Sequence, residues 1–132
     1  ETVVSGTYKR STNGGRRRGL KSPAGGAWER LSDGTYKYHF AEGLEATDYW
    51  LEIDGTWYYF GHDNIMQTGW VKDDGNWYYM DLKTGALFTG WHEISGKWYY
   101  FHEEGDGFKG TLMVNCETPD GYTVDVNGAL VE

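Results

Sequence analysis

The sequence predicts an all-β fold, a β-solenoid built from successive β-hairpins, and three observations lead to it. A Gly-Trp unit ending in Gly-x-Trp-Tyr-Tyr is written twice in a row, so that Trp70 and Trp91 lie 21 residues apart. A fixed period of about 20 residues is typical of repeat arrays whose units pack on their neighbours. A tight-turn dipeptide such as Asp54-Gly55 recurs in each unit. The periodicity of about 3.6 residues that marks helices is absent throughout.

The composition favours a thin structure. The 132 residues include 7 Trp, 11 Tyr and 20 Gly, while Leu, Ile and Val are sparse. The apolar surface to be buried is therefore carried by aromatic rings, and most of these hold a polar O–H or N–H at the tip. Such rings suit a fold in which every side chain stays near water.

The chain divides into two parts. Residues 1–26 are rich in turn formers, so we expect a linker or a degenerate N-terminal hairpin. Residues 27–132 form the repeat domain. Its units are expected at about 27–48, 49–68, 69–89 and 90–110, with a cap at 111–132. The last unit has lost its tryptophans, as an end unit of an array is expected to do, because one of its faces meets water.

Each unit is predicted to be one hairpin. The turn dipeptides are expected to supply the positive φ angles of tight hairpin turns; they are Asp33-Gly34, Asp54-Gly55, Asp74-Gly75, Ser95-Gly96 and Asp120-Gly121. Alternate side chains of a strand point to opposite faces, so Trp77 and Tyr79 share one face and Tyr78 and Met80 the other. Both faces need cover, and a lone hairpin is not stable in water. Stacking hairpins into a solenoid covers both faces at once.

The charge is unevenly distributed. The net charge is −8, and the repeat region from residue 41 onward holds four Lys or Arg against seventeen Asp or Glu. An acidic surface repels phosphate backbones, so we expect no nucleic-acid partner. No apolar run reaches the roughly 18 residues that a membrane helix needs, so we expect no membrane span.

Catalysis has little support in the sequence. The four histidines share no metal-ligand spacing, and the single Cys116 excludes an internal disulfide and a Cys-based metal site. The paired carboxylates lie in predicted turns, where a thin solenoid offers no cleft for a glycosidase. We therefore expect no enzyme activity, no catalytic residue, no metal and no cofactor.

The pattern Gly-Trp-x-x-x-x-Gly-x-Trp-Tyr-Tyr, at its step of about 20 residues, resembles the cell-wall-binding or choline-binding repeat of Gram-positive surface proteins. The resemblance covers residues 28–132 and is greatest over residues 49–110. It implies a left-handed superhelix of hairpins, with ligand sites between consecutive hairpins. It also implies that a Met or Leu of the inter-hairpin loop helps to line the site, and Met66 and Leu87 are the matching positions.

The residues themselves indicate aromatic boxes at the junctions between hairpins. Two rings of one hairpin face the same way, and a Tyr of the next hairpin closes the space between them. A box of electron-rich ring faces attracts a quaternary ammonium by cation–π interaction. The expected boxes are Trp28 and Tyr36 with Tyr58, Trp50 and Trp57 with Tyr78, and Trp70 and Trp77 with Tyr99. Trp91 and Trp98 face the last hairpin, where Thr123 replaces the expected Tyr.

Three hypotheses follow. The first is a non-catalytic module, secreted and associated with a Gram-positive cell wall, that anchors a protein by binding the choline of (lipo)teichoic acid. The second is a carbohydrate-binding module that uses the same rings as stacking platforms for a glucan or a host glycan. The third is an enzyme, for instance a wall hydrolase, of which this chain could be only the binding half. A homodimer through the solenoid ends is a further expectation.

Overall fold

The computed structural model describes residues 19–21, 26–40, 49–103 and 109–132, and these residues contain strands and turns but no helix. Five hairpins follow one another along the chain. Their strands are β2 (Ala27–Arg30) and β3 (Tyr36–His39), β4 (Tyr49–Ile53) and β5 (Thr56–Phe60), β6 (Gly69–Asp73) and β7 (Asn76–Met80), β8 (Gly90–Ile94) and β9 (Lys97–Phe101), and β10 (Cys116–Glu117) and β11 (Thr123–Val124).

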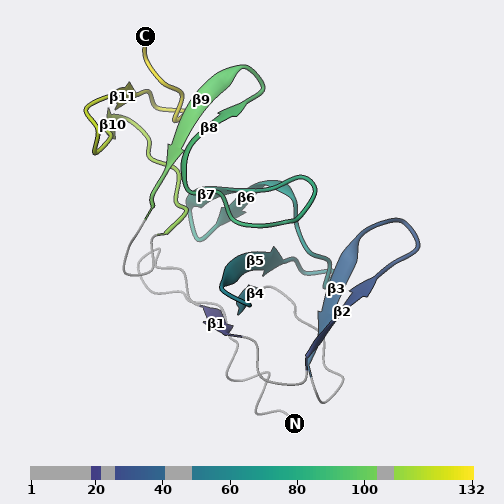
Figure 1. The fold of residues 1–132 in the computed structure, drawn as a ribbon. Helices are drawn as coiled ribbons and strands as arrows, with labels where there is room; N and C mark the ends of the chain where they lie inside the picture. Colours follow the sequence, from purple (N-terminus) through teal and green to yellow (C-terminus); the bar gives the residue numbers. More distant parts are fainter. Residues whose placement is uncertain (1–18, 22–25, 41–48, 104–108) are drawn as a thin grey trace.

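The hairpins stack end to end, as expected of a β-solenoid. Figure 1 shows them succeeding one another from β2 and β3 at the lower right to β10 and β11 at the top, each turned relative to the last. Each hairpin forms its own small antiparallel sheet, and no ladder joins one hairpin's strands to the next. The order of the array therefore comes from side-chain packing and from the connecting loops.

One strand lies in the segment expected to be a linker or a degenerate hairpin. Strand β1 (Gly19–Lys21) runs parallel to β4, with Gly19 opposite Trp50, and extends that sheet to three strands. This pairing is not apparent from the sequence, because a three-residue strand between Gly-rich stretches carries no periodic signal. Residues 1–18 and 22–25 of the same segment lie outside the described residues.

The turn geometry separates the three central hairpins from the two outer ones. Asp54-Gly55, Asp74-Gly75 and Ser95-Gly96 have positive φ at both residues, as the two-residue turns predicted for them require. In the first and last hairpins only Gly34 and Gly121 have positive φ, so the expectation was wrong for Asp33 and Asp120. Those hairpins close through longer loops, in which Gly34 donates to Leu31 and Gly121 to Thr118.

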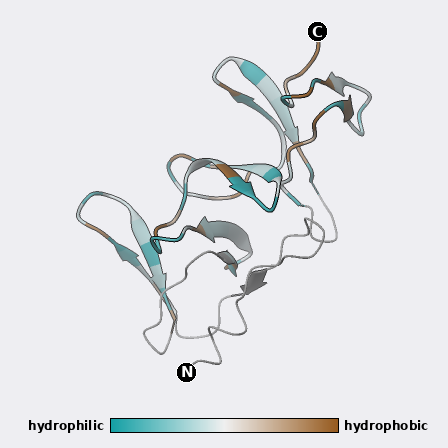
Figure 2. Cartoon of the chain, turned by 180° about the vertical axis from the view of Figure 1, so that it is seen from behind, coloured by the Kyte–Doolittle hydropathy of each residue, from teal (hydrophilic) through white to brown (hydrophobic). Residues whose placement is uncertain are grey.

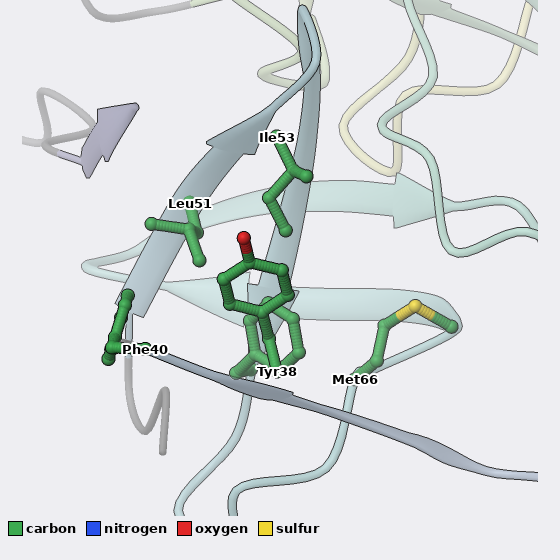
Figure 3. Close-up of a cluster of buried hydrophobic side chains, with 6 residues drawn as sticks. Tyr38, Phe40, Leu51, Ile53 and Met66 are labelled. Atoms are coloured by element: carbon green, nitrogen blue, oxygen red, sulfur yellow. The ribbon is translucent and has the colours of Figure 1, made fainter. Parts of the chain in front are cut away.

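The core consists of three small clusters, each shared by consecutive units. The first contains Tyr38, Phe40, Leu51, Ile53, Phe60 and Met66. Figure 3 shows the Tyr38 ring between Leu51 and Ile53 on one side and Met66 on the other. Tyr38 comes from the first hairpin, whereas Leu51 and Ile53 come from the second, so this cluster covers the facing sides of both. Figure 2 shows strands in pale and teal colours with brown confined to short stretches, because the buried rings are amphipathic.

A repeated backbone hydrogen bond fixes the distance between units. After each of the last four hairpins, one apolar loop residue donates its N–H to a carbonyl of the preceding hairpin. The four bonds run from Met66 to Tyr36 (2.8 Å), Leu87 to Trp57 (3.0 Å), Leu112 to Trp77 (2.8 Å) and Leu130 to Trp98 (2.8 Å). The same four residues bridge to the last strand of their own hairpin. Each loop therefore ties two consecutive units together through the backbone.

The next loop along the chain packs on that apolar side chain at a glycine. A Cβ added to Gly110 would lie 2.6 Å from Leu87 Cδ1, and the same approach recurs between Gly85 and Met66 and between Gly128 and Leu112. Gly110 also has a φ of 86°, a conformation that L side chains avoid. Gly96 has nearly the same φ, 85°, but a Cβ there would meet nothing within 4 Å.

We expect Gly110→Ala to destabilise the protein more than Gly96→Ala. The matched turn substitution Gly96→Ala costs about 1–2 kcal/mol from backbone strain alone. Gly110→Ala adds the overpacking of Leu87, roughly another 1–3 kcal/mol. Urea unfolding of both variants measures the difference in the free energy of unfolding. Equal decreases would show that Leu87 moves to accommodate the added methyl group at no cost in stability.

Candidate functional site

The Trp70 box joins the third and fourth hairpins. Trp70 on β6 lies 6.1 Å from Trp77 on β7, with the rings at 88°, and 5.1 Å from Tyr99 on β9, at 80°. The two tryptophans share a face because Trp70 lies opposite Tyr79 in the ladder and Trp77 is two residues before it. Trp70 and Trp77 keep 39% and 41% of their surface exposed. The three rings line an open cavity of about 400 Å³.

The Trp28 box, at the first junction, has almost the same geometry. Trp28 lies 6.1 Å from Tyr36 at 87° and 5.0 Å from Tyr58 at 76°. Trp28 is 38% exposed, and the three rings line a cavity of about 420 Å³. The tyrosine at position 36, where later units have tryptophan, therefore leaves the box intact. Two junctions that lie two units apart thus carry equivalent, accessible boxes.

The Trp91 box differs from the sequence expectation in its third ring. Trp91 lies 5.8 Å from Tyr122 at 90°, and Trp91, Trp98, Tyr122 and Leu130 line a cavity of about 410 Å³ together with Asp120. The expected position, Thr123, carries no ring. Tyr122 takes this place because the longer loop of the last hairpin shifts its aromatic residue by one position. The shift can be read from the sequence only if the turn is aligned as a longer loop.

The Trp50 box is closed, because its rings pack directly against one another. Trp50 is fully buried, and its ring lies 4.7 Å from that of Tyr78, which is 1% exposed. Trp57 and Leu87 pack against the same cluster. The indole Nε1 of Trp50 donates to Oδ2 of Asp73 over 2.8 Å in a buried hydrogen bond. These residues come together as the sequence predicts, but none of the cavities described above opens onto the face of Trp50.

One position of the repeat distinguishes the closed Trp50 box from the open Trp28 and Trp70 boxes. Asp73 stands three residues after the unit's first Trp, where the second and fourth units have the buried Ile53 and Ile94. Only the carboxylate can accept from an indole N–H on the preceding hairpin. The Trp28 and Trp70 boxes are each followed by a unit with Ile at this position. Asp73 is therefore the sequence difference that accompanies closure of the Trp50 box.

Loop residues complete the boxes. Met66, an expected lining residue, borders the Trp28 cavity, whereas Leu87 packs into the closed Trp50 box. Leu112 and Leu130 take the same place at the Trp70 and Trp91 boxes, and sequence reasoning missed both. The longer connection between Phe101 and Leu112 hides the repeat spacing of Leu112. Both residues are recognised as equivalents of Met66 and Leu87 by the backbone hydrogen bond that they share with them.

The histidines and the cysteine of the described residues do not line the cavities of the aromatic boxes. His39 contacts Glu29 over 2.6 Å, and the His92 ring stacks on Phe88 at 3.8 Å. Among the described residues, no three His, Cys, Asp or Glu side chains are grouped so that they could hold a metal ion. Cys116 is exposed. Within the same ranges, no helix has the length and apolar character needed to cross a membrane.

Asp120 carries a full negative charge at the Trp91 box. It accepts from the Thr118 hydroxyl and, over 2.8 Å, from Nε1 of Trp91. The Thr118 hydroxyl, and then the Trp91 N–H, hold the pKa of Asp120 below its usual value of 3.8. The carboxylate is therefore ionised at neutral pH beside three aromatic rings.

Fold and site together define a β-solenoid binding module, in which aromatic boxes lie between consecutive hairpins. A family model described as a choline-binding repeat matches residues 46–89 and 88–122, more than half of the chain. The chain therefore belongs to the choline-binding repeat family. A search among curated protein sequences finds no significant match.

Solved structures agree with this assignment. Choline-binding protein F from Streptococcus pneumoniae, in the presence of a peptidoglycan analogue, is 36% identical over 80% of this chain and 33% of its own, with a TM-score of 0.69. The choline-binding domain of Spr1274 in Streptococcus pneumoniae is 38% identical over 66% of this chain and 96% of its own, with a TM-score of 0.56. The pneumococcal cell wall endolysin from phage Cp-1, complexed with choline, is 29% identical over 96% of this chain and 37% of its own, with a TM-score of 0.54. The chain thus spans about a third of choline-binding protein F and most of the isolated domain.

We expect Asp73→Ala to destabilise the protein by about 1–3 kcal/mol, because it leaves the buried indole N–H of Trp50 without its acceptor. Asp73→Asn keeps an acceptor oxygen and should lose less. Urea unfolding of the two variants measures the difference. If Asp73→Ala unfolds like the unsubstituted chain, the hydrogen bond does not hold the Trp50 box.

The lowered pKa of Asp120 predicts an acid transition at the Trp91 box. A carboxyl group whose pKa is lower in the folded state stabilises the fold above its usual pKa, and this contribution disappears as the pH falls through the lower folded value. The indole N–H resonance of Trp91 should therefore be constant from pH 7 to about 5 and shift below about pH 4. Asp120→Asn should remove this shift, and the indole N–H resonance of Trp70 serves as the internal control. A Trp91 resonance that shifts equally in the Asn variant would contradict the assignment.

Proposed function

We propose that this chain is a non-catalytic module that binds choline in its aromatic boxes and so anchors a secreted or surface protein to choline-bearing teichoic acid of a Gram-positive cell wall. The observation that carries the proposal is the pair of equivalent open boxes at Trp28 and Trp70. Each offers three ring faces, from two consecutive hairpins, to one accessible cavity.

The chemistry of the boxes fits a quaternary ammonium. The methylated head of choline has no N–H to satisfy, so it needs no buried acceptor, and each ring contributes about 0.5–2 kcal/mol by cation–π interaction. At the Trp91 box the ionised Asp120 adds a negative charge, which favours a cation further. The excess of acidic residues after residue 40 favours cations on that part of the chain, although salt screens this effect.

The repeat arrangement favours a polymeric ligand. One box of three rings binds weakly, but boxes on one rigid array can engage successive substituents of the same polymer. The second contact then forms at a high effective concentration, so the avidity exceeds the affinity of either box without any new contact. A wall polymer with repeated choline groups has this property, and free choline would compete with it.

We expect choline to bind saturably and to change the tryptophan fluorescence, and Trp77→Ala to weaken the Trp70 box by about 2–30-fold, since one ring is lost. Trp77 is a better choice than Trp70, because Trp70 also packs on Tyr79 and Phe101 in the core. Isothermal titration with choline measures affinity and the number of sites. Leu82→Ala is the matched control, because Leu82 is 67% exposed and lines neither open box.

Two outcomes would overturn the proposal. One is the absence of any fluorescence or calorimetric response at high choline concentration. The other is retention on dextran or on a glycan array with none on a quaternary-amine resin, which would establish the same rings as stacking platforms for a carbohydrate. Turnover of peptidoglycan by this chain would contradict the non-catalytic assignment.

A further inference from the structure

The two open boxes have equivalent rings but different rims. The Trp28 cavity is bordered by Met66, Lys83 and Thr84. The Trp70 cavity is bordered by four residues of the C-terminal units, Leu112, Val114, Val126 and Asn127. One rim therefore carries a positive charge and a hydroxyl group, and the other carries mainly aliphatic side chains and one amide. Sequence alignment of the rings does not reveal this difference, because the rims come from loops further along the chain.

Lys83 is an unusual residue for its position. It is one of only four Lys or Arg residues after residue 40, where seventeen Asp or Glu occur, and its side chain is exposed. It lies in the loop after β7, two units beyond the hairpin that carries Trp28. Asp81 lies in the same loop: its Oδ1 accepts from the backbone N–H groups of Lys83 and Thr84, each over 2.8 Å. Those two backbone bonds, and to a lesser extent the Lys83 charge, lower the pKa of Asp81.

Among the described residues, no lysine or arginine lines the Trp70 cavity. Lys72 lies over the Trp77 ring at 5.8 Å, but it does not line the Trp70 cavity. Val114 and Val126 are 44% and 69% exposed and present an apolar wall on which an anionic group would lose water without gaining a partner. The two boxes should therefore differ in their affinity for a ligand that carries an anion next to its quaternary ammonium.

We propose that Lys83 makes the Trp28 box selective for a zwitterionic ligand, a quaternary ammonium joined to a phosphate ester, over the corresponding monocation. The ammonium lies among the rings of Trp28, Tyr36 and Tyr58, and the phosphate lies toward the Lys83 ammonium at the rim. The same Lys83 charge repels a free monocation. The Trp70 box shows the opposite preference. This inference rests on the proposed function and assigns the ligand form that each box prefers.

The experiment compares choline with phosphocholine at each box separately. The indole N–H resonances of Trp28 and Trp77, assigned by Trp→Phe variants, report the two boxes in one titration followed by NMR. At low salt, the ratio of phosphocholine to choline affinity should be about two- to fivefold higher at Trp28 than at Trp77, the range typical of an exposed charge pair. The difference should shrink at high salt, because the charges are solvent-exposed.

Lys83→Gln should bring the ratio at the Trp28 box to that of the Trp70 box and leave the latter unchanged. Lys97→Gln is the matched control, because Lys97 is an exposed lysine at the turn of the fourth hairpin and borders neither open box. Equal ratios at both boxes, or a ratio at Trp28 that Lys83→Gln does not change, would overturn this inference while leaving choline binding intact. Failure of both ligands to shift either resonance would overturn the proposed function as well.

Discussion

The structure depends on the contact between consecutive hairpins. The three central hairpins carry aromatic rings on both faces, and every hairpin pairs through a ladder only with itself, apart from β1 on β4. Such a hairpin is stable only when its neighbours cover it. Two interactions provide that cover: rings packed across the junction, and a loop N–H that donates to a carbonyl of the preceding hairpin. Because the core is divided among these junctions, stability accumulates along the array unit by unit.

The same contact creates the candidate binding sites, so stability and recognition compete for the same rings. Where the facing unit offers an aliphatic side chain at the position of Ile53 or Ile94, the tryptophan of the preceding hairpin remains partly exposed. Where that position is Asp73, the indole is hydrogen-bonded and fully buried. Two of the three boxes expected from the sequence are therefore accessible, and the third contributes to the core. Because the closed Trp50 box lies between them, the equivalent Trp28 and Trp70 boxes are two units apart. This separation sets the spacing that a multivalent ligand has to match.

Binding at a junction has a further consequence for specificity. A box takes its rings from two hairpins, its apolar floor from a loop, and part of its rim from a loop beyond them, as Lys83 does for the Trp28 box. The rings are constrained by the fold, because they are also core residues. Apart from Met66 and Leu112, which are buried in the core clusters, the rim residues are exposed, so they can differ between boxes at little cost in stability. The repeat can thus keep one ring geometry while the boxes differ in the ligand form they accept.

The sequence by itself determined the all-β solenoid, the positions of the hairpins and the trios of rings, because these follow from local rules: the two-residue alternation of strands, the Asp-Gly turns and the repeat period. Only the tertiary structure decided that the Trp50 box is closed, since there the fully buried indole is hydrogen-bonded to Asp73, 23 residues away. It also decided that Tyr122 and not Thr123 supplies the last ring, because the longer turn loop shifts the register. The pairing of β1 with β4 and the lining roles of Leu112 and Leu130 depend on long-range backbone contacts, and the local sequence carries no signal for them.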